Sequence, residues 1–454
     1  MMEKIWMVIR STSLLAFFIS ATILEAQSQS MSLKECIEYG LENHRSNKIY
    51  TNDLHAAEAK IQQGKSAYLP QVSINGEIDD NLKVQTSVIP GSIVGSDQDM
   101  RVAFTKQFST NITAQVEQTI FDQSLITSFK AYRYTRQEAE LNKELNDESI
   151  IYNVVTAYYH VLVSREQLAF LSENIEIYKK QMAIADLRVA KGVMTEVDQN
   201  RIKVNYHNTL SQLNVAENTL TFSENQLKNY MGFPLADQIQ IDSIALSEKI
   251  FDLAAQHDKT AFNSEVRTDF KLSQVNVSLL EIDEKRLRAQ ALPQLKAFGR
   301  YGGVGFGDNL SESFSTIADF ATVGVKLNIP IFTGFNRVSQ VKQAQFSLQN
   351  AKENLELQKE NFALEYENSH NKLVQSRANL DNDDRTLELS RSVFQSTDLQ
   401  YEKGVVGLTD WLDTQRSLRD SQSSYLTSLF SFYESLVELE KANGTLKNFY
   451  NSLQ

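Results

Sequence analysis

Two stretches of this sequence, 122–191 and 335–403, contain neither glycine nor proline. Each holds about 70 residues and would run roughly 105 Å if wholly helical, because an α-helix rises 1.5 Å per residue. A second stretch of the same kind follows each of them, at 195–230 and at 408–443. Helices this long without internal breaks are typical of coiled coils and helical repeats rather than of compact domains. We therefore predict a mainly α fold built on long helical hairpins.

Four shorter segments outside these stretches alternate apolar with polar residues. In the last of them, Val323, Val325 and Leu327 alternate with Lys326 and Asn328. A period of two is typical of a strand with one apolar and one polar face. Each segment has roughly the 9–11 residues that a tilted strand needs to cross a bilayer. The predicted strands lie at 72–79, 112–120, 295–301 and 321–329.

Four such strands cannot form a closed barrel by themselves. An interior wide enough to be filled by side chains needs about eight strands. An open sheet edge does not occur in contact with lipid, so several chains must pool their strands. The joins within the two strand pairs, 83–100 and 307–317, are polar, and we expect irregular loops there.

The composition excludes several kinds of function. A formal net charge of −12 and a pI near 5.2 argue against a nucleic-acid-binding role. The single cysteine, Cys36, excludes an intrachain disulfide and any CxxC site, and we expect it to be a small buried residue on a helix face. The histidines lack metal-binding spacing and no catalytic motif is present, so we predict no metal, no cofactor and no enzymatic activity. The six histidines are His44, His55, His160, His207, His257 and His370.

The first 26 residues have the pattern of a secretory signal peptide. Lys4 and Arg10 precede an apolar run at 14–19, and a small residue, Ala26, stands at the expected cleavage point. We therefore predict that residues 1–26 are removed and that the protein is exported. Beyond them, no stretch approaches 18 consecutive apolar residues, so no transmembrane helix is expected.

Three landmarks occur twice in the same order, which indicates an internal duplication. They are Leu69-Pro70-Gln71 with Leu292-Pro293-Gln294, Ile120-Phe121-Asp122 with Ile331-Phe332-Thr333, and 186–193 with 398–405. The last pair is 212 positions apart. We predict a first repeat at 27–231, a linker at 232–249, a second repeat at 250–443 and a C-terminal segment at 444–454. Each repeat would hold short helices, a strand hairpin and a long helical hairpin.

These landmarks resemble the TolC-type family of outer-membrane efflux channels. The resemblance rests on the LPQ motif before a strand, the I-P-I-F-T-G-F segment at Ile329–Phe335 and the repeated K-G-V turns. Residues 401–413 are similar to the family pattern Y-x-x-G-x-x-x-x-x-D-x-L-D. The resemblance covers about residues 30–450. It implies a homotrimer in which four strands per chain contribute to a 12-strand barrel in the cell outer membrane, with a helical tunnel in the periplasm.

The same resemblance implies a gate at the periplasmic tips of the helices. It places Asp410 and Asp413 at the constriction, where threefold symmetry would make rings of carboxylates. Asp198 occupies the matching place in the first tip, and Tyr401 is expected to pair with it in a closed state. The sequence departs from the family at Val406, where many members carry an arginine, so the rest of this closed-state network is not predicted.

The two tips are the expected docking sites for a periplasmic adaptor protein. They are Lys191-Gly192-Val193 and Lys403-Gly404-Val405, in which glycine relieves the backbone between antiparallel helices. The alternative is that these residues only make the turn. Where family members often have an apolar residue, this chain has Lys191 and Lys403, so the adaptor here is expected to present acidic groups.

The resemblance implies the function of an exit duct in a tripartite efflux or type I secretion system. The duct would conduct substrates passively from an inner-membrane pump and a periplasmic adaptor, with outer-membrane lipid around its barrel. The alternative is a trimeric coiled-coil surface protein or adhesin with a structural role. The symmetric splitting of two strand hairpins by helices favours the duct. The exported substrate, whether drug, metal ion or polypeptide, is left open, because such ducts take their specificity from the pump.

Overall fold

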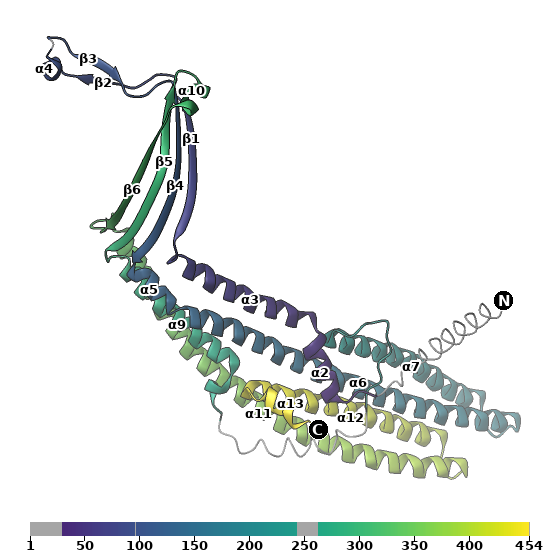
Figure 1. Ribbon diagram of the computed structural model, residues 1–454. Coiled ribbons are helices and arrows are strands. Elements are labelled where there is room, and N and C mark those ends of the chain that lie inside the picture. The colour runs from purple at the N-terminus through teal and green to yellow at the C-terminus, as the bar shows by residue number, and fades with distance from the viewer. Residues whose placement is uncertain (1–29, 96, 243–261, 454) are drawn as a thin grey trace, which may run out of the picture. The chain divides into compact units, whose positions relative to one another are not determined.

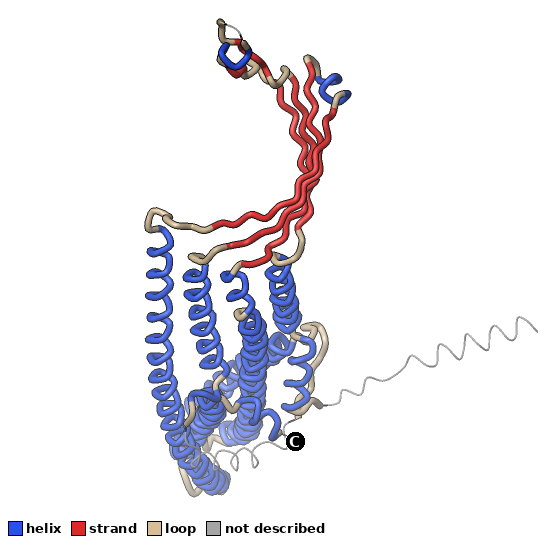
Figure 2. Tube along the Cα trace, turned by 60° about the vertical axis from the view of Figure 1, so that its left-hand side comes forward, coloured by secondary structure: helices blue, strands red, loops and turns tan. Residues whose placement is uncertain are grey.

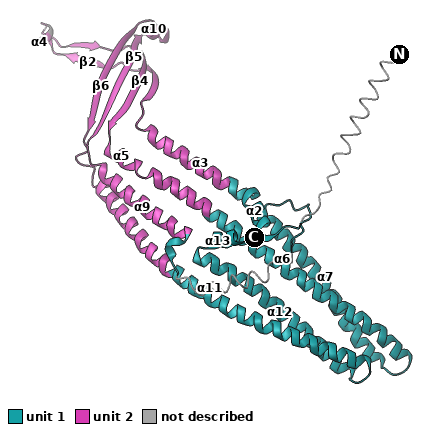
Figure 3. Cartoon of the chain, turned by 60° about the horizontal axis from the view of Figure 1, so that its bottom comes forward, with its two compact units in different colours: residues 1–48, 145–267, 361–454 teal, residues 49–144, 268–360 magenta. Residues whose placement is uncertain are grey.

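The computed structural model describes residues 30–95, 97–242 and 262–453 (Figure 1). The predicted signal peptide 1–26 lies outside the described residues, as do residues 243–249 of the predicted linker 232–249. The described chain is mainly helical, in agreement with the predicted fold class. It separates into two compact units, each assembled from distant parts of the sequence (Figure 3). Unit 1 comprises 1–48, 145–267 and 361–454, and unit 2 comprises 49–144 and 268–360.

Unit 2 contains a four-stranded antiparallel sheet (Figure 2). Its strands follow the order β1-β4-β5-β6, so the two strand pairs of the sequence lie side by side through β4 and β5. All four predicted strands are present, although β4 and β5 are longer than the alternation indicated. The bounds are β1 Gln71–Asp80, β4 Phe108–Phe121, β5 Gln294–Gly307 and β6 Ile317–Asn328.

The strand register separates an apolar face of this sheet from a polar one. Directly opposed residues share a face, and Ile74, Ala114, Tyr301 and Ala321 form one such row. On the polar face, the Nζ atom of Lys296 lies 2.6 Å from Oε1 of Glu117. The apolar face is exposed to its surroundings, as expected of a sheet that faces lipid. Its exposed members include Val72, Ile74, Ile78, Ile112, Val116, Val323, Val325 and Leu327.

The joins within the strand pairs are more regular than predicted. The first contains a hairpin of β2 (Thr86–Ile89) and β3 (Met100–Ala103) around the short helix α4 (Gly91–Val94). The second contains α10 (Leu310–Ser315), whose N-terminus is capped by a hydrogen bond from the backbone N–H of Glu312 to the Asn309 side chain. The expectation of irregular loops was wrong, because local capping and pairing supply backbone hydrogen bonds that polarity alone does not reveal.

The helix that directly follows β4 begins at a capped position. Asp122 follows β4 directly, and its carboxylate accepts a hydrogen bond of 2.8 Å from the backbone N–H of Ser124. The helix that follows, α5 (Gln123–Phe129), ends before the long helix begins at Tyr132, so the predicted uninterrupted stretch 122–191 is divided in two. The other helices that lie mostly in unit 2 are α3 (Arg45–Ser66) and α9 (Thr268–Ala289).

Unit 1 is dominated by the two predicted helical hairpins. Their helices are α6 (Tyr132–Ala190), α7 (Glu196–Met231), α11 (Asn336–Glu402) and α12 (Leu408–Asn443), of which α6 and α11 extend into unit 2. The described part of this unit also contains the short helices α2 (Leu33–Asn43) and α13 (Leu446–Ser452) and the 3-10 helix η2 (Ser264–Val266). The first begins with a capping box, in which Ser32 and Glu35 bond to each other's backbone N–H groups. Cys36 on α2 is fully buried, as expected, and this burial raises the pKa of its thiol to about 12.

The two hairpins match at positions that are 212 residues apart. Within the first hairpin, the hydroxyls of Ser164 and Ser223 meet at 3.3 Å, and in the second those of Ser376 and Ser435 meet at 2.6 Å. Each of these pairs is buried between the two helices of its hairpin. The residue after α7 is Gly232 and the residue after α12 is Gly444, with φ angles of 69° and 71°. Equivalent residues therefore pack the two helices of each hairpin together and end its second helix. Each compact unit contains residues from both predicted repeats.

Candidate functional site

The turns at the ends of the two hairpins have the same backbone structure. Gly192 and Gly404 have φ angles of 72° and 74°, in the left-handed region that favours glycine. The backbone N–H of Val193 donates to the carbonyl of Arg188, 3.0 Å away, and the N–H of Val405 donates to that of Gln400 at 2.9 Å. Both valines are more than two-thirds exposed, and Lys191 and Lys403 are exposed beside them. Each tip thus offers a cation and an apolar side chain to a partner.

The helices that follow the tips begin in related ways. At the start of α7, the Thr195 hydroxyl accepts a hydrogen bond of 3.1 Å from the backbone N–H of Asp198. At the start of α12, Gly407 has no side chain, and its own N–H instead donates to the Asp410 carboxylate at 3.3 Å. Asp198 and Asp410 therefore occupy equivalent positions in the first turn of their helices. A carboxylate is stabilised there by the positive end of the helix dipole.

The charges one turn further along differ between the tips. In the first tip, Arg201 lies 3.7 Å from the Asp198 carboxylate, so the pair is nearly neutral. The equivalent residue of the second tip is Asp413, on the same side of α12 as Asp410. Both aspartates are exposed, and in the described part of the chain no basic side chain forms an ion pair with either. At these two equivalent positions, the first tip thus presents an ion pair and the second tip presents two carboxylates without a basic partner.

Tyr401 lies inside the second tip rather than on its surface. Its side chain is 4% exposed, and its ring centroid is 5.9 Å from that of Trp411. The Arg188 guanidinium lies 4.7 Å from the centre of the Tyr401 ring and donates to the Tyr401 carbonyl at 3.0 Å. Burial raises the pKa of the Tyr401 phenol, and the nearby Arg188 opposes that rise. Within the described part of one chain, Asp198 bonds to Thr195 and pairs with Arg201, so its pairing with Tyr401 stays a prediction.

A half-buried acceptor near the second tip, Asp398, was missed by the sequence reasoning. Both the Trp411 indole N–H and the Gln181 amide donate to one carboxylate oxygen of Asp398, each at 2.7 Å. Trp411 is fully buried, so the tip is packed around this pair. A signal was available, because Asp398 opens the repeated segment and its counterpart Asp186 accepts from Gln199 in the same way, at 2.5 Å. At the position of the absent arginine, Val406 is half-buried and packs against the Trp411 cluster.

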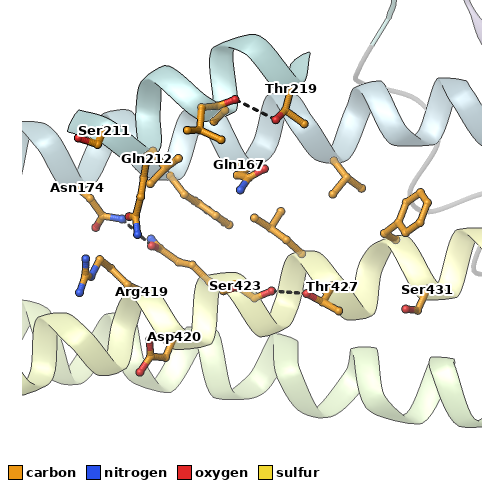
Figure 4. Close-up of a pocket in the computed structure, with 18 residues that line it drawn as sticks. Gln167, Asn174, Ser211, Gln212, Thr219, Arg419, Asp420, Ser423, Thr427 and Ser431 are labelled. Carbon is orange, nitrogen blue, oxygen red and sulfur yellow. Dashed lines mark hydrogen bonds between the residues drawn. The ribbon is translucent and has the colours of Figure 1, made fainter. Parts of the chain in front are cut away.

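Further from the tip, buried amides join α6 to α12. The Tyr178 hydroxyl donates to Gln415 at 2.5 Å, Gln415 donates to Asn174 at 3.3 Å, and Asn174 donates to Gln422 at 2.8 Å. Because buried polar groups need specific partners, this chain of bonds fixes the register of the two helices. A cavity of 740 Å³ adjoins it between α6, α7 and α12 (Figure 4). Polar side chains from all three helices border this cavity, among them Gln167, Gln212 and Arg419.

Metal-binding and membrane-spanning features were also sought in the described residues. Among them, no group of three or more histidine, cysteine, aspartate or glutamate side chains has the arrangement of a metal site. His257 lies outside the described residues. Of the helices in the described ranges, none is long and apolar enough to cross a membrane.

Comparison with known proteins gives consistent matches along the chain. The family model described as "Outer membrane efflux protein" matches residues 41–233 and 267–445. The outer membrane protein TolC of Vibrio cholerae is 23% identical over 446 residues, which cover 95% of each chain. TolC of Escherichia coli is 19% identical, over 87% of this chain and 78% of its own. The solved Campylobacter jejuni CmeC outer membrane channel has a TM-score of 0.72 at 17% identity, covering 92% of this chain and 88% of that one.

Removal of the Asp398 carboxylate should loosen the second tip. Asp398→Ala leaves the buried Trp411 indole without its acceptor, and we expect a loss of about 1–3 kcal/mol in local stability. Guanidinium titration in detergent, followed by the fluorescence of Trp411, measures this as a lower midpoint and a red-shifted emission. The matched variant Asp186→Ala should shift the midpoint much less, because Asp186 is exposed. Equal shifts in the two variants would show that the Asp398 contact does not hold the tip.

Proposed function

This chain belongs to the outer membrane efflux protein family, and we propose that three copies of it form a duct that receives substrates from an inner-membrane pump through a periplasmic adaptor. The family places the protein in the outer membrane, with its helical tunnel in the periplasm, as a channel and not an enzyme. The match extends along both halves of the chain, and it therefore favours the duct over the alternative function of a structural adhesin.

The open sheet is the observation that carries the proposed assembly. Within the described residues, the sheet ends at β1 on one side and at β6 on the other. In hydrocarbon, the free N–H and C=O groups of both edges would each cost several kcal/mol. A second and third copy can pair with these edges, and three copies supply 12 strands. That number exceeds the roughly eight strands at which side chains already fill a barrel, so an open lumen is left for the substrate.

Assembly would also gather the tips around one axis. Asp410 and Asp413 would then contribute six carboxylates to the periplasmic end of the tunnel, whereas the Asp198–Arg201 pair of the first tip would add little net charge. Rings of carboxylates attract cations and repel one another. We assign the cation-attracting part of the gate to Asp410 and Asp413. Asp198, whose charge is offset by Arg201, and Tyr401 would instead form a contact that holds the gate closed. The burial of Tyr401 suits it to fixing the shape of the second tip.

The exposed turns suit the contact with an adaptor. Val193 and Val405 offer apolar surface at the ends of both hairpins, and Lys191 and Lys403 place positive charge next to it. Exposed apolar residues with a charged border are typical of protein interaction sites. An adaptor that contributes acidic and apolar side chains would complement both tips, with Gly192 and Gly404 holding the turns in shape.

The double substitution Asp410→Ala with Asp413→Ala tests the gate. Wild-type channels in a planar bilayer should be cation-selective and should be blocked by a trivalent cation added on the periplasmic side. Loss of the carboxylates should weaken this block at least about tenfold, which corresponds to roughly 1.4 kcal/mol, and should reduce selectivity.

The first tip supplies the control for this measurement. Asp198→Ala with Arg201→Ala removes a nearly neutral pair at the equivalent positions, so block and selectivity should persist. If the Asp410 and Asp413 double variant keeps its affinity for the trivalent cation, the constriction lies elsewhere and the assignment of these two residues is wrong.

Charge reversal at the tips tests the docking of the adaptor. Lys191→Glu with Lys403→Glu should abolish pump-dependent efflux in cells, because like charges would then face the acidic adaptor, while the amount of assembled protein stays unchanged. Lys48→Glu with Lys60→Glu makes the same change of charge on exposed residues of α3 and should leave efflux intact. Normal efflux in the tip variant, at normal expression, would mean that the lysines only flank a turn.

A further inference from the structure

The glycine-rich segment of β5 forms a shallow notch on the apolar face of the sheet. Gly303, Gly305 and Gly307 alternate along the strand, so all three point to one face. The register identifies that face, because Gly305 is opposite Thr110, and Thr110 is opposite Ile78 of the exposed apolar band. β5 therefore carries no side chains on the lipid side at the end where it leads into α10.

The helix α10 lies at the end of the sheet (Figure 1), and its backbone fills this notch. A Cβ atom at Gly307 would lie 2.5 Å from the backbone nitrogen of Ser313, and one at Gly305 would overlap the Ser313 carbonyl oxygen. The helix backbone thus rests directly on the strand, which only glycine permits. The Ser313 and Thr110 hydroxyls meet at 2.8 Å, and both residues are at least 99% buried. By covering Thr110, α10 satisfies a hydroxyl that would otherwise face hydrocarbon.

The two sides of α10 differ in polarity. On one side, the Nζ atom of Lys106 lies 2.6 Å from the Glu312 carboxylate and 3.1 Å from that of Asp308. The hydrogen bonds to Glu312 and Asp308 raise the pKa of Lys106. On the other side, Leu310 and Phe314 are one helical turn apart and are 46% and 44% exposed. An ion-paired polar side next to an apolar stripe is typical of a helix at a water–lipid boundary.

We propose that α10 is a lipid anchor, in which Leu310 and Phe314 insert among the acyl chains of the outer leaflet near the headgroups. Lipid is the expected partner of these side chains, because α10 lies on the same face of the sheet as the exposed apolar band of the strands. The segment between β6 and α11, at the other end of the sheet, has a comparable feature in Phe332 and Phe335, which are 74% and 70% exposed. Barrels in membranes have such apolar girdles at both boundaries, and α10 would supply the outer one in place of strand side chains.

This proposal goes beyond conduction and depends only on the sheet lying in the outer membrane. Tryptophan fluorescence tests it on the assembled protein in vesicles made of phosphatidylcholine brominated at acyl carbons 6 and 7, or at 11 and 12. With the wild-type spectrum subtracted, Phe314→Trp should be quenched more by the shallow bromines, and the mid-strand Val323→Trp more by the deep ones. Ser87→Trp, in the β2–β3 hairpin, should respond to aqueous iodide instead. Quenching of Phe314→Trp by iodide alone, or by neither reagent, would overturn the anchor in favour of a solvated loop or a protein contact.

The notch is tested by a pair of glycine variants on the same face. Gly305→Val should displace α10, so that Phe314→Trp becomes at least twofold more accessible to iodide and the assembly dissociates at a lower temperature. Gly76→Val is the matched control, because a Cβ at Gly76 meets no atom within 4 Å, and it should change neither property. Unchanged quenching in Gly305→Val would show that the glycines do not seat the helix. If Gly305→Val prevents assembly, the bromine experiment on Phe314→Trp still decides whether α10 contacts lipid.

Discussion

The unpaired edges of the four-stranded sheet are the constraint on which the rest of the structure depends. A sheet with one exposed apolar face suits a bilayer, but hydrocarbon cannot satisfy the backbone groups of β1 and β6. Pairing with further copies removes both edges at once, and every other part of the chain is then repeated around the same axis. In the proposed assembly, the closure of the barrel and the gathering of the tips would therefore have one physical origin.

Symmetry explains why a small difference between the two tips matters. The hairpins are built alike, with left-handed Gly192 and Gly404 and with buried serine pairs at equivalent positions. Their electrostatics differ because Arg201 of the first tip is replaced by Asp413 in the second. In one chain this exchange alters a solvated surface, where charges interact weakly. Around an axis, the same exchange becomes a concentration of negative charge at one end of a tunnel.

Long-range periodicity made much of the fold predictable. The helical hairpins were predicted from the stretches without glycine or proline, and the four strands from the alternation of apolar and polar residues. Both tips were predicted from the repeated K-G-V segments. Features that depend on one local or tertiary contact were missed. The break at Lys130 and Ala131 has no glycine or proline to mark it, and α10 depends on a notch that forms only when β5 pairs with β4. The role of Asp398 required knowing which donors are buried beside it, which a single sequence does not disclose.

The mass of the assembled protein in a mild detergent tests the central claim most directly. Light scattering with correction for bound detergent, or native mass spectrometry, gives the number of chains without reference to transport. If three chains share one barrel, the particle should contain three chains and should dissociate only when the sheet unfolds. A folded monomer with intact β-structure would contradict the account, because the edges of its sheet would then be satisfied by something other than further copies of the chain.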